Sequence, residues 1–265
     1  MDIVKRNFFK LLRSGALNEF DTLEPMSPYK WRRLMGIAQA QRVGDIALRG
    51  LRNHQYDKGI ELPRDVLNLQ IDTPAVAAAA DTTLSNKMLN RRLDRIRKGE
   101  PHVIDASMDT LYLLNLLVDG TVGILTRGIS IGHAISLGRY LRTKGDKVDF
   151  VKLERWLHTL HLQRMAQLQG SVLISVLDFE QDEVPFVQQV EPQAFSLTMR
   201  SLDHAPSETD GEMHFWQAEN GMVHNNATAL RQNLHRTLRF FRYAPAETIA
   251  HFFSRFAHSL SELEE

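Results

Sequence analysis

Residues 107–127 read SMDTLYLLNLLVDGTVGILTR, and this stretch decides the fold class. Leu111, Leu114 and Leu117 recur at the spacing that keeps apolar side chains on one face of an α-helix. Ser107 stands where such a helix begins, because a hydroxyl side chain can accept a hydrogen bond from the N–H groups of the first turn. We therefore predict a strongly apolar helix here.

The same helical spacing extends outward from this stretch over nearly the whole chain. Gly128 interrupts it, and the pattern resumes directly afterwards. The other expected helices cover residues 2–14, 28–51, 75–98, 130–143, 150–157, 162–177, 192–202, 227–243 and 245–263. Residues 144–146 indicate a turn, and residues 203–222 are rich in Asp, Pro, Ser, Gly and Glu, which predicts the longest loop. Residues 102–104 form either a short strand or a simple connector.

This pattern predicts an all-α fold with at most vestigial short strands. We expect a single helical domain over residues 1–265, with a subdivision into 1–100 and 101–265 as the alternative. Two of the helices carry long apolar stripes. The stripe in residues 75–98 is Leu84, Met88, Leu89, Leu93 and Ile96, and that in residues 245–263 is Ile249, Phe252, Phe253, Phe256, Leu260 and Leu263.

Composition excludes several classes of protein. Of the 265 residues 43% are hydrophobic, so the chain can bury a core and wholesale disorder is not expected. Lys+Arg and Asp+Glu both number 32, so the chain lacks the basic excess typical of nucleic-acid binders. There is no cysteine, which excludes disulfides and thiolate chemistry. The N-terminal residues lack a signal-peptide core and no uninterrupted apolar run approaches about 20 residues, so we expect a cytoplasmic protein.

Two small groups of residues have the chemistry of metal ligands. His158 and His161 are three residues apart, which can place both imidazoles on one helix face. Asp178, Glu180 and Asp182 alternate just beyond an apolar helix, where carboxylates could hold a hard cation. Neither group comes with the further ligands that a closed site needs, so a polar helix end and a solvated acidic loop are the favoured interpretations. No metal or cofactor is predicted.

Two basic clusters have the chemistry to bind phosphates or acidic partner surfaces. The first is Arg91, Arg92, Arg95, Arg97 and Lys98, and the second is Arg231, His235, Arg236, Arg239 and Arg242. The candidate binding residues among them are Arg91, Arg92, Arg95, Arg236 and Arg239. The alternative interpretation is a charged outer face, or arginines that tie helices together through carboxylates.

No complete catalytic site can be assembled from the sequence. Four serines, Ser85, Ser107, Ser171 and Ser254, lie in no G-x-S-x-G elbow and in no S-x-x-K motif. Glycine-rich phosphate loops are also missing. Gly44-Asp45 lies inside a helical pattern, where one carboxylate without a neighbouring partner cannot hold magnesium for phosphoryl transfer. No catalytic residue is predicted, and the sequence does not favour an enzyme.

Six segments, taken in their order along the chain, carry a family resemblance: residues 8–15, 40–51, 111–115, 128–129, 149–165 and 239–247. They resemble the helices that flank the catalytic core in a largely uncharacterised bacterial nucleotidyltransferase-like family. The segments span most of the chain, and residues 239–247, which read RFFRYAPAE, are the most distinctive.

The resemblance implies a core with a glycine turn and paired aspartates that chelate magnesium with the nucleotide phosphates. In the family this core lies between the helix ending here near Arg97 and the helix beginning near Ser107. Residues 98–106 are too few to form it. Gly132 and Ser136 also stand where the family has Arg and Asp, so no catalytic residue carries over.

These departures predict a non-catalytic binding or scaffolding protein, with regulation of an intact relative as one form of that role. A residual nucleotide- or phosphate-binding module that uses the arginine clusters is the alternative. A third hypothesis, a metal enzyme built on His158, His161 and residues 178–182, has the least support. The expected partner is a protein or a second copy of the chain, rather than a membrane or nucleic acid.

Overall fold

The computed structural model describes residues 1–69, 82–99, 107–203 and 239–261. Every regular element within these ranges is a helix, and no strand occurs in them. The all-α prediction is therefore confirmed. Residues 102–104, nearly all of the loop expected at 203–222 and most of the helix expected at 227–243 lie outside the described ranges.

The helices have the following bounds: α1 Ile3–Leu17, α2 Pro28–Ala40, α3 Gly44–Asn53, α4 Arg64–Leu67, α5 Lys87–Gly99, α6 Ser107–Arg127, α7 Ile131–Lys144, α8 Phe150–Thr159, α9 Gln163–Leu177, α10 Ala194–Asp203 and α13 Pro245–Ser261. Two short 3₁₀ turns lie at Gly145–Lys147 and Gln181–Glu183. Asp149 caps α8, since its carboxylate accepts a hydrogen bond of 2.9 Å from the N–H of Lys152.

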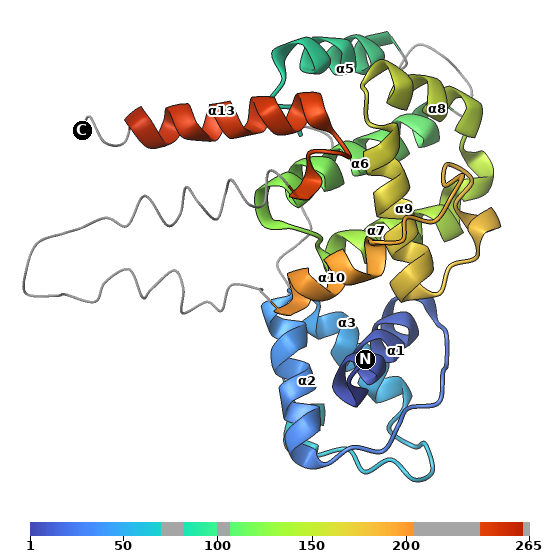
Figure 1. Cartoon of the computed structure of the whole chain (residues 1–265). Coiled ribbons are helices and arrows are strands. Elements are labelled where there is room, and N and C mark those ends of the chain that lie inside the picture. Colours follow the sequence, from blue (N-terminus) through green and yellow to red (C-terminus); the bar gives the residue numbers. More distant parts are fainter. Residues whose placement is uncertain (70–81, 100–106, 204–238, 262–265) are drawn as a thin grey trace, which may run out of the picture.

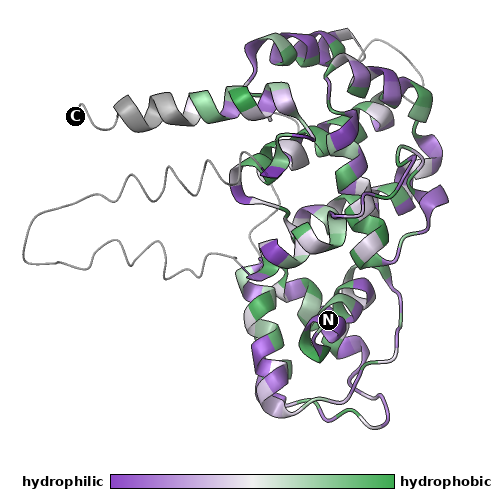
Figure 2. Ribbon diagram, viewed as in Figure 1, coloured by the Kyte–Doolittle hydropathy of each residue, from purple (hydrophilic) through white to green (hydrophobic). Residues whose placement is uncertain are grey.

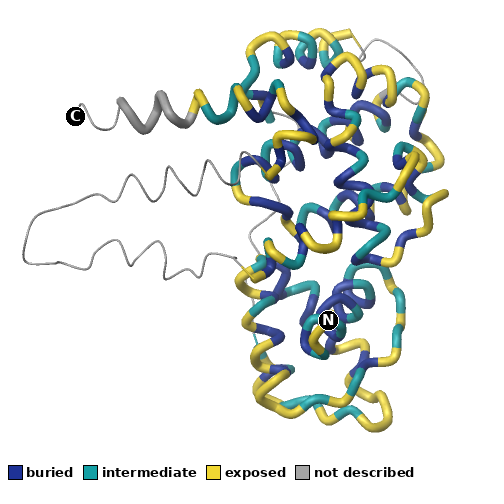
Figure 3. The backbone as a smooth tube through the Cα atoms, in the orientation of Figure 1, coloured by how far each residue is buried: buried dark blue, intermediate teal, exposed yellow. Residues whose placement is uncertain are grey.

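Figure 1 shows α1, α2 and α3 at one end of the molecule, α6, α7 and α9 in the middle, and α5 and α8 at the other end. The buried apolar side chains form one cluster that runs from Val4 in α1 to Ala244 before α13. Figure 3 shows buried positions, in dark blue, along the helices that pack in the body of the protein. The described parts of residues 1–100 and 101–265 therefore share a core.

Helix α6 is the most apolar helix of the described chain. Its segment Met108–Arg127 is long and apolar enough to cross a membrane by length and composition, although Asn115 and Asp119 interrupt its apolar residues. Of the apolar window in this segment, 61% is buried inside the protein. A core helix meets the same criteria of length and apolarity, because both environments exclude water.

The helix expected over residues 28–51 is wrong in one respect, because it is broken into α2 and α3. Arg42 has a φ of 56°, the left-handed conformation that ends many helices. The N–H of Val43 donates to the carbonyl of Ala38, and α3 then begins at Gly44. Gly44-Asp45 therefore lies in the first turn of a helix and not inside one.

The apolar stripe expected in residues 75–98 is only partly buried. Helix α5 begins at Lys87, after Asn86, whose side-chain oxygen accepts hydrogen bonds from the N–H groups of Met88 and Leu89. Leu89 and Leu93 are buried, but Met88 is exposed, which corrects the expected inward position. Asn86 therefore caps this helix, and Met88 lies on the exposed side of its first turn.

Helices α1 and α3 touch through their backbones at two glycines. A Cβ atom on Gly50 would lie 2.1 Å from the carbonyl oxygen of Leu11, and one on Gly15 would lie 2.0 Å from that of Ile46. Real Cβ atoms do not approach backbone atoms so closely. The contact joins two of the segments that carry the family resemblance, residues 8–15 and 40–51.

Four of the nine residues in the distinctive segment 239–247 are buried. Phe240, Tyr243 and Ala244 are buried. Glu247 is 1% exposed, and its carboxylate accepts hydrogen bonds from the N–H groups of Ser85 (2.5 Å) and Asn86 (3.0 Å) just before α5. This carboxylate therefore fastens α13 to the start of α5.

Beyond this point α13 leaves the body of the protein (Figure 1). Ile249 and Phe253 of its expected stripe are exposed, although both are strongly apolar (Figure 2). The stripe therefore does not pack against the described part of the protein at these positions.

The extended segment between α1 and α2 is held by Glu24. Arg6 donates to both carboxylate oxygens, from Nε to Oε1 at 2.8 Å and from Nη2 to Oε2 at 2.7 Å, and Lys10 Nζ lies 3.6 Å away. Asn7 adds a reciprocal pair of hydrogen bonds with the Glu24 backbone.

We expect the Glu24 carboxyl to titrate with a pKa of about 2 in place of 4.5, chiefly because Arg6 donates hydrogen bonds to its ionised form. A depressed folded pKa stabilises the fold above the unfolded pKa, and that contribution is lost as the pH falls from about 4.5 toward about 2. Carbon-13 NMR titration of the carboxyl measures this directly. Arg6→Ala should return the pKa toward 4.5, and a wild-type pKa already near 4.5 would contradict the bidentate pair.

Candidate functional site

The first basic cluster lies on α5, where it divides between structural and exposed residues. Arg92 donates to the carbonyl of Thr159 at 2.8 Å and lies 3.3 Å from His161, which ties α5 to the end of α8. Arg97 donates to Asn115 in α6 at 2.8 Å. Arg91 and Arg95 are exposed and remain available for a ligand.

The second basic cluster is only partly described. Arg236 lies outside the described residues, together with Arg231 and His235, and Arg239 is exposed. Arg242 pairs with Glu191 and stacks on the ring of Tyr243, with its guanidinium carbon 4.6 Å from the ring centroid. Arg242 therefore fits the alternative interpretation, in which an arginine ties two segments of the chain together.

The two groups with metal-ligand chemistry are used otherwise. His158 belongs to α8, whereas His161 lies beyond the end of that helix with a φ of 54°. Asp178 lies 3.2 Å from Arg13, and Glu183 pairs with Arg142 and with the N–H of Glu180. In the described part of the chain no three His, Asp or Glu residues are grouped so as to hold a metal ion.

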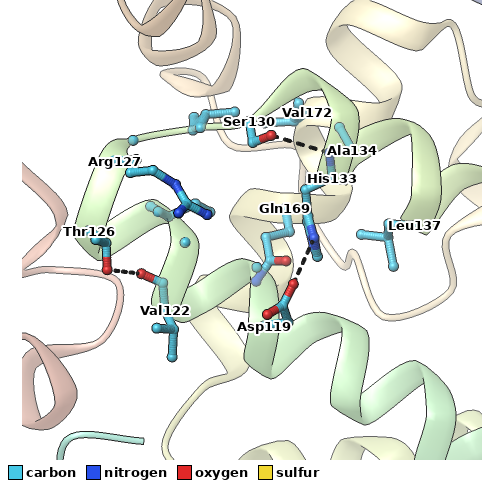
Figure 4. A pocket seen from close by; sticks show the side chains of 15 residues that line it. Asp119, Val122, Thr126, Arg127, Ser130, His133, Ala134, Leu137, Gln169 and Val172 are labelled. Carbon is cyan, nitrogen blue, oxygen red and sulfur yellow. Dashed lines mark hydrogen bonds and ion pairs between the residues drawn. The ribbon is translucent and has the colours of Figure 1, made fainter. Parts of the chain in front are cut away.

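A cavity of about 140 Å³ lies between α6, α7 and α9 (Figure 4). Its walls are mostly apolar, and the side chains that form them are Val122, Ile124, Ile129, Ala134, Leu137 and Val172. Its polar side chains are Asp119, Thr126, Arg127, Ser130, His133 and Gln169. An apolar cavity with a few converging polar groups is the usual form of a small-molecule site.

Gln169 supplies the first unusual group of this cavity. It is 4% exposed, and its Nε2 donates to the carbonyl of Leu117 at 2.9 Å and to Thr121 Oγ1 at 3.3 Å. Both partners accept, so the nitrogen must lie on their side and Oε1 must face the cavity. Oε1 is buried and has no hydrogen-bond partner within the described protein.

His133 supplies the second unusual group of this cavity. Its Nδ1 lies 3.5 Å from Asp119 Oδ2, and its Nε2 is buried without a hydrogen-bond partner among the described residues. In Figure 4 the imidazole turns toward Asp119 and Gln169. Two buried polar atoms without a hydrogen-bond partner therefore face the same cavity.

Asp119 orients the His133 ring. The hydrogen bond with His133 lowers the pKa of the Asp119 carboxyl against the opposing effect of burial, and a 2.8 Å hydrogen bond from Thr82 Oγ1 acts in the same direction. An ionised carboxylate only accepts, so it favours the tautomer that carries its proton on Nδ1. Nε2 then presents a lone pair to the cavity.

Gly120 makes this arrangement possible. A Cβ atom at this position would lie 2.1 Å from Gln169 Oε1 and 2.4 Å from His133 Nε2. Any other residue would displace both atoms. The glycine therefore leaves the room in which the two orphaned atoms converge.

The opposite wall is formed where α6 ends and α7 begins. Gly128 has a φ of 96°, which a glycine adopts without strain, and the N–H of Ile129 then donates to Ser201 Oγ in α10 at 3.1 Å. Ser130 caps α7 by accepting from the N–H of His133 at 3.3 Å. Arg127 turns its guanidinium toward the cavity (Figure 4).

Residues 128–132 read G-I-S-I-G, so the chain does contain a G-x-S-x-G motif, at Ser130 and not at the four serines considered above. Its setting differs from a nucleophile elbow, because it joins two helices and Ser130 has a φ of −94°. The Ser130 hydroxyl accepts from the backbone of His133, and no hydrogen bond joins it to the imidazole. Ser130, His133 and Asp119 share one cavity without forming a catalytic triad.

An S-x-x-K match also exists, at Ser27–Lys30, but both side chains are exposed at the start of α2. The signals that point to the real cavity are different. Asp119 is a carboxylate inside the most apolar helix, and two glycines, Gly120 and Gly123, follow it. Of the candidate arginines, the four that the structure describes, Arg91, Arg92, Arg95 and Arg239, do not line this cavity.

Comparisons of the chain with protein-family models, with curated proteins and with solved structures found no match. The resemblance to a nucleotidyltransferase-like family therefore stays a prediction. The cavity has to be interpreted from its own geometry.

Proposed function

We propose that this protein binds a small polar molecule in the cavity between α6, α7 and α9. The observation that carries the proposal is the pair of buried, unpartnered atoms, Gln169 Oε1 and His133 Nε2. A buried polar atom without a partner costs about 1–3 kcal/mol, and two such atoms that face one cavity can both be satisfied by a molecule bound there. This is a binding role, in line with the non-catalytic function expected from the sequence.

The size of the cavity limits the ligand. A dry cavity of about 150 Å³ can hold a molecule such as benzene, so about 140 Å³ suits roughly six to ten non-hydrogen atoms. Whole nucleotides are too large for it. Phosphate or nucleotide binding by Arg91 and Arg95 would need a separate site on the outer face of α5.

A catalytic role has less support from the same residues. His133 has the orientation of a general base, but the two hydroxyls that line the cavity are engaged with backbone groups. Thr126 donates to the carbonyl of Val122 at 2.7 Å, and Ser130 accepts from the N–H of His133. The geometry is therefore better suited to holding a molecule than to attacking one.

Replacing Gln169 by methionine should abolish ligand binding and leave stability within about 1 kcal/mol of the wild type, or raise it. Methionine has a similar shape, and Thr121 Oγ1 already donates to the Leu117 carbonyl at 2.7 Å, so that acceptor stays satisfied. Stability is measured by urea unfolding. Gln167→Met, on α9 but away from the cavity lining, is the matched control.

Binding is measured by thermal shift with a library of molecules of fewer than about ten non-hydrogen atoms, to which phosphate and nucleotides are added. We expect stabilisers of the wild type and of Gln167→Met that fail to stabilise Gln169→Met. The proposal is overturned if no library member stabilises the wild type, or if every stabiliser acts equally on Gln169→Met. Stabilisation by nucleotides that persists in Gln169→Met would favour the arginines of α5.

A further inference from the structure

We infer that the ligand is a small zwitterion, a molecule of a few carbons with an amino group at one end and a carboxylate at the other. The inference rests on the proposed binding function and specifies its chemistry. It follows from which groups the cavity presents at its two ends.

The end formed by Gln169 and His133 presents acceptors. The Gln169 amide nitrogen is held by two acceptors of α6, so Oε1 cannot exchange places with it. With Nδ1 of His133 directed at Asp119, Nε2 is the second acceptor. One ligand atom that satisfies both needs two hydrogens. An amino group has them, and a hydroxyl does not.

Charge at this end favours the protonated amine. Asp119 is ionised and lies directly behind the His133 ring, so its negative charge acts on whatever meets Nε2. Hydrogen bonds from a cationic donor are stronger than those from a neutral one. A neutral amide could reach both acceptors, but the Asp119 charge would attract it less than a cation.

The other end of the cavity presents positive charge. Arg127 makes no ion pair or hydrogen bond with the described residues, and its charge acts on Asp119 only over a distance. Arg127 is an exposed residue, and its side chain lines the cavity (Figure 4). Ser130 adds a hydroxyl hydrogen at the start of α7, where the helix dipole favours an anion. A carboxylate fits this end because guanidinium binds it through two hydrogen bonds.

Apolar walls connect the two ends. Ile124, Leu137 and Val172 enclose a space for a short aliphatic segment. A cavity of about 140 Å³ has room for an amino acid of the size of alanine or 4-aminobutyrate, and excludes large side chains. Short amino acids therefore form the ligand class.

The test is calorimetric titration of the full chain with alanine, β-alanine and 4-aminobutyrate, beside propionate, lactate and ethylamine. Propionate lacks the amino group, lactate replaces it by a hydroxyl and ethylamine lacks the carboxylate. We expect at least one zwitterion to bind about tenfold or more tightly than every comparator, the weight of one charge-assisted hydrogen bond. Arg127→Gln should weaken this binding, whereas Arg139→Gln, an exposed position of α7 outside the cavity, should not.

Other results would overturn the inference. Lactate equal to alanine would show that one donor hydrogen suffices, and ethylamine equal to the zwitterions would show that Arg127 plays no part. If the zwitterions do not bind but another small molecule does, and loses binding in Gln169→Met, the ligand class is wrong and the binding function stands. If no small molecule binds at all, both the ligand class and the proposed binding function are wrong.

Amide NMR shifts distinguish a variant that blocks binding from a variant that only damages the fold. A zwitterion should move the backbone signals of Gly120, His133 and Gln169 in the wild type. Gly120→Ala should remove these changes, because its Cβ would occupy the space of both acceptor atoms. Shifts confined to α5 would overturn the assignment of the site.

Discussion

Replacing Gly50 by alanine should cost at least about 3 kcal/mol of unfolding free energy, enough to unfold a marginally stable chain. The added Cβ would lie 2.1 Å from the carbonyl oxygen of Leu11 and 2.8 Å from its carbonyl carbon. Backbone atoms of a packed helix cannot rotate away as a side chain can. Helices α1 and α3 would have to separate, which opens the core between them.

Urea unfolding followed by circular dichroism measures this loss. Gly36→Ala is the matched control, because Gly36 also lies inside a helix but a Cβ there meets nothing within 4 Å. That variant should be unchanged or more stable by up to about 1 kcal/mol, since alanine is the better helix former. Equal stability of the two variants would show that α1 and α3 do not touch through their backbones.

Replacing Glu247 by alanine should destabilise the protein by about 2–4 kcal/mol, because two part-buried backbone N–H groups lose their acceptor and a buried carboxylate is removed. Those groups belong to Ser85 and Asn86, directly before α5. Their loss should release both the start of α5 and the base of α13. Hydrogen exchange at Leu89 and at Thr248 would report the two effects separately.

The pH dependence gives a second measurement on Glu247. Burial raises the pKa of this carboxyl above 4.5, although the two N–H donors act against it. A raised folded pKa adds stability below the unfolded pKa, and that addition is lost as the pH rises through the folded value. The wild type should therefore gain stability relative to Glu247→Gln on acidification from neutral pH to about 4.5. A difference that does not vary with pH would contradict the burial of an ionised Glu247.

Most of the helices could be predicted from local pattern. Helices α6, α7, α8 and α9 begin and end within a few residues of their expected bounds, because caps and apolar spacing act within one or two turns. The break between α2 and α3 could not be predicted in this way. The apolar spacing continues across it, and only the left-handed conformation of Arg42 reveals the change of direction.

The candidate arginines show what a cluster of charges in the sequence cannot predict, namely which of its members make structural contacts. Arg91, Arg92 and Arg95 look alike in sequence, but Arg92 lies against the end of α8 and the other two face outward. Which side of a basic helix meets another helix depends on the neighbour. The cluster alone could not separate a binding residue from a structural one.

The cavity escaped prediction for a related reason. Asp119, His133 and Gln169 lie on three helices, and their spacing along the chain matches no known motif. The sequence held one signal, a carboxylate and two glycines within an otherwise apolar helix. That signal marks α6 as an unusual helix, but it does not show which residues of other helices lie against it.

The sequence by itself determined that this protein is helical and where most of its helices lie. These properties depend on contacts within a few residues, which periodicity and capping record. Only the tertiary structure decided that two glycines join α1 to α3, that Glu247 fastens α13 to α5, and that Gln169 and His133 converge on Gly120. Each of these depends on which helix faces meet, and many pairings of apolar faces satisfy one and the same sequence pattern.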